Sequence, residues 1–227
     1  MRPAKPRDKR IDKPREKVGD FTALALSKAA YTLSVHDPSK LPAPGAAEIA
    51  FAGRSNAGKS SAINTLTGRK RLAYVSKTPG RTQLINFFEL SSERRLVDLP
   101  GYGFAKVPER VRLHWLQLME HYFNVRESLV GLILIVDSRR GLGAQDAGML
   151  EWVLARDRFA HVLLTKADKL NRRDADRVLR ETAAACSDTS VTAQLFSAHE
   201  RTGLDEARQV MDRWLDIAQK KAPVVTK

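Results

Sequence analysis

The sequence predicts an α/β protein of three layers, in which helices cover both faces of a mixed, mainly parallel six-stranded sheet. Short apolar runs alternate along the chain with segments whose apolar residues recur at helical spacing, which is the pattern of strand–helix–strand units. Two of the apolar runs are separated by only four residues, close enough for an antiparallel pair. A glycine-bearing turn joins the first clear strand to a helix. In such sheets ligands bind at turns of this kind, beyond the carboxyl ends of the strands.

The strands follow from apolar runs of strand length. The expected strands span residues 48–52, 83–90, 95–98, 130–136, 159–164 and 191–196. Residues 130–136 are apolar without interruption, which indicates a strand covered on both faces. The runs 83–90 and 95–98 are separated by a polar stretch and are expected to pair antiparallel. Helical connections between the other strands predict that most of the sheet is parallel.

The helices follow from apolar residues repeated on one face. The expected helices span residues 61–66, 109–123, 144–155, 173–185 and 203–219. Trp115, Leu118 and Tyr122 recur at helical spacing, so this aromatic stripe is expected to pack in the core. Residues 21–35 have weak helical character, and the proline-rich stretch 38–45 then breaks the chain before the first strand.

Length and composition indicate one domain with a basic extension. We divide the 227 residues into a basic arm at 1–19, a globular body at 20–220 and a tail at 221–227. The arm has almost no apolar content and is expected to be disordered. The net charge is +13, and because residues 1–20 carry eight basic and four acidic side chains, +9 belongs to the rest of the chain. This excess favours a polyanionic partner, although a solubilising surface would have the same composition.

The compartment is predicted from cysteine content and hydropathy. Cys186 is the single cysteine, which excludes an internal disulfide framework and favours a reducing compartment. The longest apolar run is far too short to cross a bilayer, and the first residues lack the apolar segment of a signal peptide. We therefore expect a cytoplasmic protein without a membrane span, and nothing in the sequence requires more than a monomer.

The central motif is a phosphate-binding loop of the form G-x-x-x-x-G-K-S between a predicted strand and a predicted helix. It consists of Gly53, Arg54, Ser55, Asn56, Ala57, Gly58, Lys59 and Ser60. The two glycines let the backbone curl so that its N–H groups point at phosphate oxygens beside a helix N-terminus. Lys59 would bring a positive charge to the β- and γ-phosphates, and Ser60 would offer a hydroxyl to Mg²⁺.

A second motif selects the base of the nucleotide. Thr165, Lys166, Ala167 and Asp168 follow the predicted strand 159–164. The Asp168 carboxylate can accept hydrogen bonds from N1–H and the amino group of guanine, whereas adenine would leave it unpaired, which costs about 1–3 kcal/mol. The stem of Lys166 can cover the face of the base. A short loop follows the next strand and consists of Phe196, Ser197 and Ala198, and one of its N–H groups can meet guanine O6. The predicted ligands are GTP and GDP.

The γ-phosphate side of the site is predicted from two loops. Asp98 ends a strand and belongs near the Mg²⁺, through water, while the N–H of Gly101 can meet the γ-phosphate. Thr82 and Thr78 are both candidates for the hydroxyl that completes Mg²⁺ coordination when GTP is bound. Because these groups lie on two separate loops, loss of the γ-phosphate should release both, which makes a conformational switch.

Two positions modify this scheme. Tyr102 follows Gly101 where a fast GTPase has a glutamine that orients water, so slow intrinsic hydrolysis is expected. Gln83, Arg69, Arg71 and Arg81 could contribute to hydrolysis, although structural or partner-facing roles suit them better. Asn56 could bind K⁺ beside the phosphates or could simply brace the turn.

The motifs together resemble the EngB (YihA/YsxC) family of bacterial GTPases over about residues 20–220. The resemblance rests on residues 53–61, on T-P-G-R-T-Q at 78–83, on D-L-P-G-Y-G at 98–103 and on T-K-A-D at 165–168. It implies the P-loop GTPase fold, Mg²⁺-dependent GTP binding, a role in assembling the large ribosomal subunit, and a need for the protein in cell division and septation. The basic arm is not part of the shared pattern.

The resemblance also implies the site residues. Besides the phosphate-binding loop, Thr165–Asp168 and Phe196–Ala198, the nucleotide contacts would be Gly80, Arg81, Thr82, Gln83, Leu84, Asp98, Leu99, Pro100 and Gly101. The Mg²⁺ ligands would be Ser60 and Thr82, which favours Thr82 over Thr78. Lys59, Thr82 and Gly101 would act on the transferred phosphate.

Two other functions fit parts of the pattern. A guanine-nucleotide-dependent regulator of a protein partner in division would use the same site without contacting RNA. A nucleotide kinase would use the phosphate-binding loop for phosphoryl transfer, but Lys166 and Asp168 and the lack of an arginine-rich lid segment argue against it. The leading predicted partner is the one that the resemblance implies, the precursor of the large ribosomal subunit with its RNA and proteins.

Overall fold

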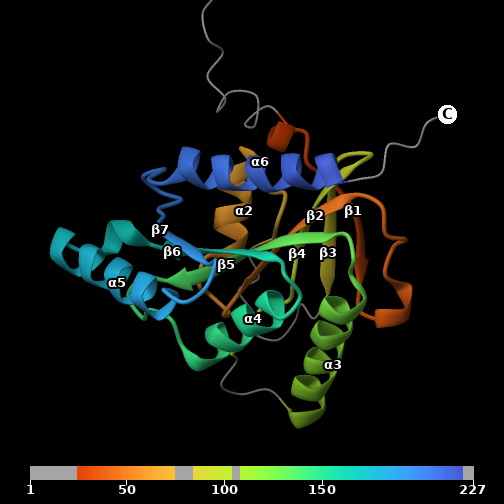
Figure 1. Ribbon diagram of the computed structural model, residues 1–227, viewed down its shortest axis with the longest axis horizontal. Coiled ribbons are helices and arrows are strands. Elements are labelled where there is room, and N and C mark those ends of the chain that lie inside the picture. Colours follow the sequence, from red (N-terminus) through yellow and green to blue (C-terminus); the bar gives the residue numbers. More distant parts are fainter. Residues whose placement is uncertain (1–24, 75–83, 104–107, 222–227) are drawn as a thin grey trace, which may run out of the picture.

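The structure is a computed structural model that describes residues 25–74, 84–103 and 108–221, with side chains described up to residue 218 (Figure 1). The basic arm at 1–19, the Thr78 and Gly80–Gln83 stretch and all but the first residue of the 221–227 tail lie outside the described residues. Within the described part, no helix is long and apolar enough to cross a membrane.

The sheet has seven strands in the order β1-β3-β4-β2-β5-β6-β7. These are β1 (Ala30–Val35), β2 (Ala47–Gly53), β3 (Ile85–Ser91), β4 (Arg94–Asp98), β5 (Leu129–Asp137), β6 (Phe159–Thr165) and β7 (Thr192–Leu195). As predicted, β3 and β4 pair antiparallel, and the strands from β4 through β2, β5 and β6 to β7 run parallel to one another. The α/β class and the mixed, mainly parallel sheet are confirmed.

The predicted count of six strands is wrong, and so is the helix expected up to residue 35. Residues 30–35 form β1, which pairs antiparallel with β3 at the edge of the sheet. Side chains reinforce the pairing, since Thr32 Oγ1 donates to the carbonyl of Phe87 at 3.0 Å and Ser34 Oγ donates to Asn86 Oδ1 at 2.6 Å. The weak helical pattern is therefore overridden by cross-strand contacts to a distant segment.

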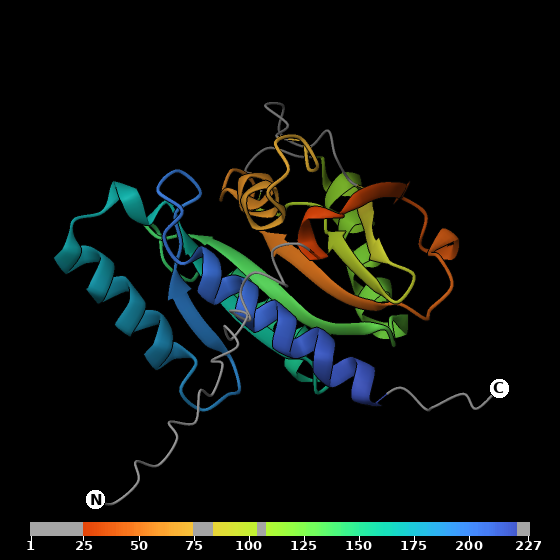
Figure 2. The same cartoon turned by 90° about the horizontal axis from the view of Figure 1, so that it is seen from above.

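Helices cover both faces of the sheet, which makes three layers (Figures 1 and 2). They are α2 (Lys59–Thr67), α3 (Glu109–Val125), α4 (Ala144–Leu154), α5 (Arg172–Ala185) and α6 (Leu204–Lys221), with short 3-10 turns η1 (Pro38–Lys40) and η2 (Ala167–Lys169). Helices α2 and α6 pack on one face, and α3, α4 and α5 contribute to the core on the other. All five helices lie where the sequence predicts them, with ends that differ by two residues at most.

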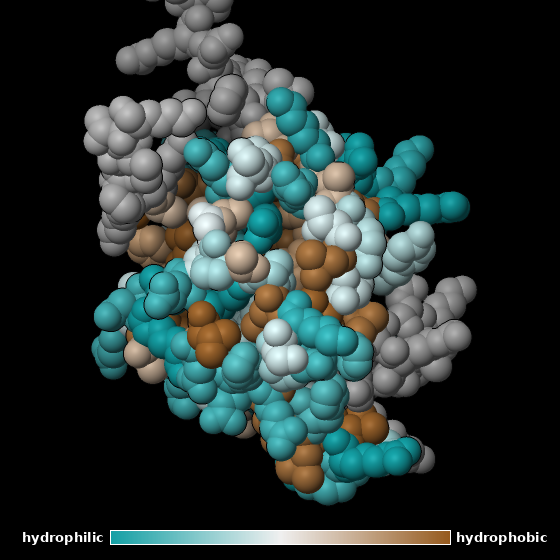
Figure 3. Space-filling model, turned by 90° about the vertical axis from the view of Figure 1, so that its right-hand side faces the viewer, coloured by the Kyte–Doolittle hydropathy of each residue, from teal (hydrophilic) through white to brown (hydrophobic). Residues whose placement is uncertain are grey.

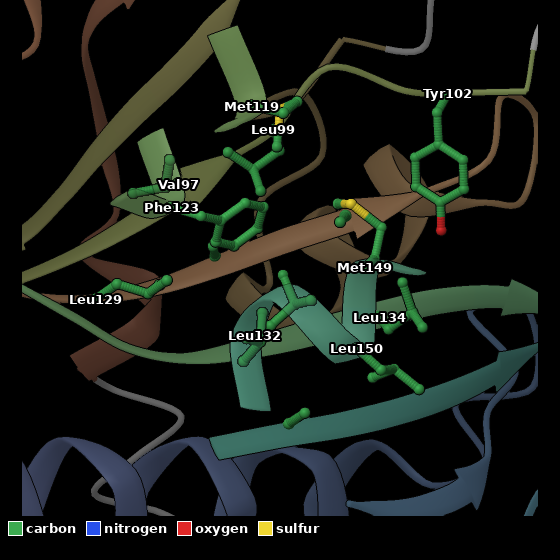
Figure 4. Packing of buried hydrophobic residues seen from close by; sticks show 14 of the residues in the cluster. Val97, Leu99, Tyr102, Met119, Phe123, Leu129, Leu132, Leu134, Met149 and Leu150 are labelled. Atoms are coloured by element: carbon green, nitrogen blue, oxygen red, sulfur yellow. The ribbon is translucent and has the colours of Figure 1, made fainter. Parts of the chain in front are cut away.

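Two hydrophobic clusters lie on opposite faces of the sheet. Alternate residues of β5 divide between them: Leu132 and Leu134 pack with α3 and α4, while Ile133 and Ile135 pack with α2 and α6. Figure 4 shows the first cluster, in which Phe123 and the neighbouring side chains fill the space above β5 (Figure 4). On the side of the molecule that carries β1 and α3, hydrophobic areas are small and separated by hydrophilic residues (Figure 3).

His161 should make stability depend on pH. This residue of β6 is only 3% exposed, and its ring nitrogens lie 2.7 Å from Thr192 Oγ1 and 3.0 Å from Gln194 Oε1. Burial lowers its pKa from the usual 6.5 to about 4. Between these values the unfolded chain takes up the proton before the folded chain does, so stability falls as the pH falls through this window. The loss on reaching pH 4 should be about 3 kcal/mol.

Urea unfolding of the intact protein at pH 7 and at pH 5 measures this effect. His161→Gln should flatten the dependence, because the group that takes up the proton is gone. The matched control is His121→Gln, an exposed histidine of α3, which should keep the dependence of the unchanged protein. Equal pH dependence in all three proteins would contradict the assignment to His161.

Candidate functional site

The phosphate-binding loop joins the end of β2 to the start of α2. Gly58 has φ of 104°, in the left-handed region, and immediately precedes the first helical residue. A Cβ at Gly53 would lie 2.6 Å from the carbonyl oxygen of Ile135 on β5, so only glycine fits there. Both glycines of the motif are thus required by the backbone path, as the sequence predicts. Thr165 Oγ1 donates to the carbonyl of Ala57 at 2.5 Å and fixes the loop against the end of β6.

Beside this loop lies a pocket of about 1020 Å³. Its lining includes the predicted contacts Arg54, Ser55, Asn56, Gly58, Lys59, Ser60, Leu84, Asp98, Leu99, Pro100, Gly101 and Lys166. Gly101 lies close to the loop, since a Cβ there would be 3.6 Å from the carbonyl oxygen of Gly53 and from the backbone of Ser55. The structure therefore brings the first motif and the D-L-P-G motif to one pocket at the carboxyl ends of the parallel strands. The side chain of Leu99 is the exception, because it is fully buried in the core.

The groups predicted for the γ-phosphate and Mg²⁺ lie side by side. Lys59 Nζ forms an ion pair with Asp98 Oδ1 at the pocket wall. The next residue, Ser60, donates its hydroxyl hydrogen to the carbonyl of Tyr74 at 3.0 Å. Among the described residues no three His, Cys, Asp or Glu side chains gather as a metal site. One hydroxyl and one carboxylate nonetheless fit Mg²⁺, which binds few protein ligands and keeps phosphate and water in its shell.

The base-recognition motif contacts the second half of the phosphate loop, at Asn56 and Ala57. Lys166 has φ of 59°, and its Nζ donates to the carbonyl of Asn56 at 2.7 Å and to Asp137 Oδ2 at 2.8 Å. Its side chain therefore runs along the loop, with its Cε 3.9 Å from a Cβ placed on Gly58. This path fits the predicted cover over one face of a base.

Asp168 is held as an ionised acceptor. Ser197 Oγ donates to Asp168 Oδ1 at 2.7 Å, and this hydrogen bond, with a smaller contribution from Lys169, keeps the pKa of the Asp168 carboxyl below its usual value. The same hydroxyl accepts from the N–H of Glu200 at 3.0 Å. Ser197 thus joins the motif at 165–168 to the loop at 196–198. The sequence did not predict this contact.

Of the loop residues 196–198, only one N–H is free to meet a ligand within the described part of the chain. The N–H of Phe196 donates to the carbonyl of Leu164, and that of Ser197 donates to Thr202. The carbonyl of Phe196 accepts from Ala167 at 3.2 Å. The N–H of Ala198 has no acceptor among the described residues, so it is the group that suits guanine O6.

Tyr102 belongs to the core rather than to the pocket. Its side chain is 4% exposed, its ring packs against Trp115 of α3 at 5.8 Å, and its hydroxyl donates to Asp146 Oδ1 at 2.5 Å (Figure 4). Burial and the neighbouring carboxylate raise the pKa of the Tyr102 hydroxyl. Asp146 in turn accepts from the N–H of Gly143 at the start of α4, at 2.8 Å. The loop after β4 is therefore tied to two helices on one face of the sheet.

Tyr102→Phe should lower the free energy of unfolding by about 1–3 kcal/mol, because it leaves the buried Asp146 carboxylate without this donor. The comparison is Tyr31→Phe. Among the described residues the Tyr31 hydroxyl bonds only to Ser34, on the exposed edge of the sheet, and its loss should change stability by no more than about 0.5 kcal/mol. Urea unfolding of the two variants measures both values. If the two substitutions have equal effects, the Tyr102–Asp146 bond contributes nothing.

Two residues of the site were missed in the sequence. Asp137 ends β5 and accepts a hydrogen bond from Lys166. Burial raises the pKa of the Asp137 carboxyl, but the hydrogen bonds from Arg139 and Lys166 together lower it by more, so the carboxyl is ionised. Asn64 of α2 does not line the pocket, but its side chain accepts from the N–H groups of Leu72 and Ala73, which do. The only sequence signal for Asp137 is an acidic residue directly after an apolar strand, and Asn64 has none.

A strand, a glycine-bearing phosphate loop and a helix, followed by an aspartate at the next parallel strand and a T-K-x-D sequence, define the class of P-loop GTPases. A family model described as "50S ribosome-binding GTPase" matches residues 48–166. The chain is 54% identical over 190 residues to the "Probable GTP-binding protein EngB" of Azoarcus sp. strain BH72, covering 82% of this chain and 91% of that protein. The chain belongs to the EngB family of GTP-binding proteins, and it is a GTPase.

A second relative supports the family, and a solved structure supports the fold. The EngB protein of Aromatoleum aromaticum is 52% identical over 201 residues, which are 87% of this chain and 92% of that one. The crystal structure of a probable GTP-binding protein EngB superposes with a TM-score of 0.61 at 24% identity, over 75% of this chain and 100% of the other. This second likeness shows the fold.

Proposed function

We propose that this chain is a GTP-controlled switch that acts in assembly of the large ribosomal subunit. The observation that carries the proposal is the match of residues 48–166 to a model of 50S ribosome-binding GTPases, because that range contains the phosphate loop, Asp98 and Lys166. A net charge of +13 suits a partner rich in RNA phosphate. The proposal treats 20–220 as one GTPase domain, with the basic arm at 1–19 and the tail at 221–227 outside it.

In this proposal the nucleotide lies along the pocket with its base at Asp168. The carboxylate accepts from N1–H and the amino group of guanine, and the N–H of Ala198 donates to O6. The phosphates lie in the loop 53–60, where Lys59 leaves Asp98 for the β- and γ-phosphates. A bound Mg²⁺ would neutralise charge on the phosphate oxygens, held by Ser60 and, in the GTP state, Thr82.

The switch would work through the loop after β4. The N–H of Gly101 binds the γ-phosphate, while the next residue, Tyr102, packs against Trp115 of α3 and donates to Asp146 of α4. Hydrolysis is slow in this proposal, because the Tyr102 hydroxyl is committed to Asp146 and cannot orient water. A partner would then set the rate of GTP hydrolysis. Impaired assembly of the subunit would limit growth and thereby division and septation.

Asn56 is the residue at which a K⁺ effect would arise. It lies at the exposed turn of the phosphate loop with φ of 63°, and its carbonyl accepts from Lys166. If K⁺ binds there, hydrolysis should be faster in KCl than in NaCl of equal concentration, and Asn56→Ala should abolish the difference. Equal rates in both salts would show that Asn56 only braces the turn.

Sedimentation with isolated large ribosomal subunits tests the proposed function. The full chain is mixed with subunits in the presence of a non-hydrolysable GTP analogue, GDP or no nucleotide, over a series of salt concentrations. We expect binding in the analogue state that weakens steeply with salt. Guanine-nucleotide binding without sedimentation in any state would contradict the ribosomal role. Association with a protein partner that does not weaken as the salt concentration rises would favour the regulator of a partner in division.

A further inference from the structure

A basic and aromatic surface lies beside the phosphate pocket. It consists of Arg69, Lys70, Arg71, Tyr74 and Tyr31, and we refer to it as the 69–74 surface. All five side chains are exposed, with Tyr74 84% and Tyr31 57% exposed. Within the described part of the chain, none of its three cations forms an ion pair. Such a surface offers unpaired positive charge and two exposed aromatic rings, of which Tyr31 contacts Phe88 edge-on at 6.3 Å between ring centroids.

The backbone of this surface is fixed by α2. Gly68 ends the helix in the left-handed region, and the N–H of Arg69 donates to the carbonyl of Asn64 at 3.0 Å. The Asn64 side chain accepts from the N–H groups of Leu72 and Ala73 at 3.0 and 2.9 Å, and donates to the carbonyl of Ala73 at 2.9 Å. The exposed cations therefore project from an ordered turn.

The 69–74 surface is continuous with the nucleotide pocket. Its five residues line the same 1020 Å³ pocket as Lys59, Asp98 and Gly101. The hydroxyl of Ser60, a predicted Mg²⁺ ligand, donates to the carbonyl of Tyr74 at 3.0 Å. In Figure 2 the end of α2 and the strand β1 lie at the same end of the molecule (Figure 2). A partner on this surface would therefore lie beside the γ-phosphate.

We propose that the 69–74 surface binds a single-stranded segment of RNA, which rests on the proposed ribosomal function. The cations would contact phosphates, and Tyr74 and Tyr31, which line the same pocket, would stack on bases. An acidic protein segment would use the cations but would gain little from two exposed aromatic rings. The Ser60–Tyr74 hydrogen bond makes this contact sensitive to the occupant of the nucleotide site.

Fluorescence anisotropy with a labelled oligoadenylate of about 12 nucleotides tests the surface in the full-length protein with GDP bound. Arg69→Ala/Arg71→Ala should reduce the slope of log K against log salt concentration by about 1.4, since two phosphate contacts are removed. Tyr74→Ala should weaken binding by between about 5- and 150-fold, whereas Tyr74→Phe should retain it, because the ring still stacks. Affinity for GDP should be unchanged in all three variants.

The matched control is Arg180→Ala/Arg213→Ala, which removes two exposed cations from α5 and α6. Salt slopes equal in the two double variants would overturn the proposal. If Tyr74→Ala lost affinity for GDP but kept its affinity for RNA, the surface would belong to the nucleotide site. If Tyr74→Phe weakened RNA binding as much as Tyr74→Ala does, stacking would be excluded. If the variants bind RNA normally while the unchanged protein still sediments with subunits in the GTP-analogue state, this inference fails and the proposed function stands.

Discussion

Asp168→Asn should transfer the preference of the site from guanine to xanthine. The carboxylate accepts two hydrogen bonds from guanine, but an amide can accept only one and presents a donor to the amino group. Xanthine carries an oxygen at that position and can accept from the amide. Affinity for GDP should fall by about 10- to 150-fold, the effect of losing one hydrogen bond to a charged group, and affinity for XDP should rise. The Ser197 hydroxyl can still donate to the asparagine oxygen, so the loop should keep its structure.

Titration calorimetry with GDP, XDP and ADP measures this exchange of specificity. Asp176→Asn is the control, since it makes the same chemical change at an exposed position of α5 and should leave all three affinities unchanged. ADP should bind weakly to every variant. If Asp168→Asn bound GDP as tightly as the unchanged protein does, Asp168 would not contact the base.

Arg126→Ala should be the most destabilising single substitution considered, lowering the free energy of unfolding by about 3–5 kcal/mol. Arg126 is 4% exposed and donates to both oxygens of the fully buried Glu48, at 2.8 and 2.5 Å. Tyr122 donates to the same carboxylate at 3.3 Å. Removing the arginine leaves a buried charge without its main partner, at the end of the sheet far from the phosphate loop.

Urea unfolding of Arg126→Ala and Arg112→Ala separates the buried ion pair from an exposed one. Arg112 pairs with Glu109 on the surface of α3, and its loss should change stability by less than about 1 kcal/mol. The double variant Glu48→Gln/Arg126→Met should recover part of the loss, because it removes the unpaired charge. A change of less than about 1 kcal/mol in Arg126→Ala would contradict the account of this network.

The sequence predicted local features of the fold well, because they depend on nearby residues. The uninterrupted apolar run of β5 and the helical stripe of α3 follow from one segment each, and both lie where expected. The strand β1 was missed because its pairing depends on β3, more than fifty residues away, while its own residues favour no structure strongly.

The candidate site divides in the same way. The glycines of the phosphate loop, Lys59 and Asp168 could be predicted as site residues because their spacing is local and their chemistry specific. The role of Tyr102 was not found: the sequence shows that it replaces a glutamine, but its bond to Asp146 joins residues 44 positions apart. Likewise, the hydroxyl of Ser197 on Asp168 required the three-dimensional arrangement of two loops.

The central claim is that the nucleotide in this site controls docking on the large ribosomal subunit. Sedimentation with subunits, using the unchanged protein and Asp168→Asn with non-hydrolysable analogues of GTP and XTP, tests it most directly. We expect the unchanged protein to sediment with the GTP analogue alone and Asp168→Asn with the XTP analogue alone. Sedimentation of both proteins regardless of the nucleotide would contradict the claim.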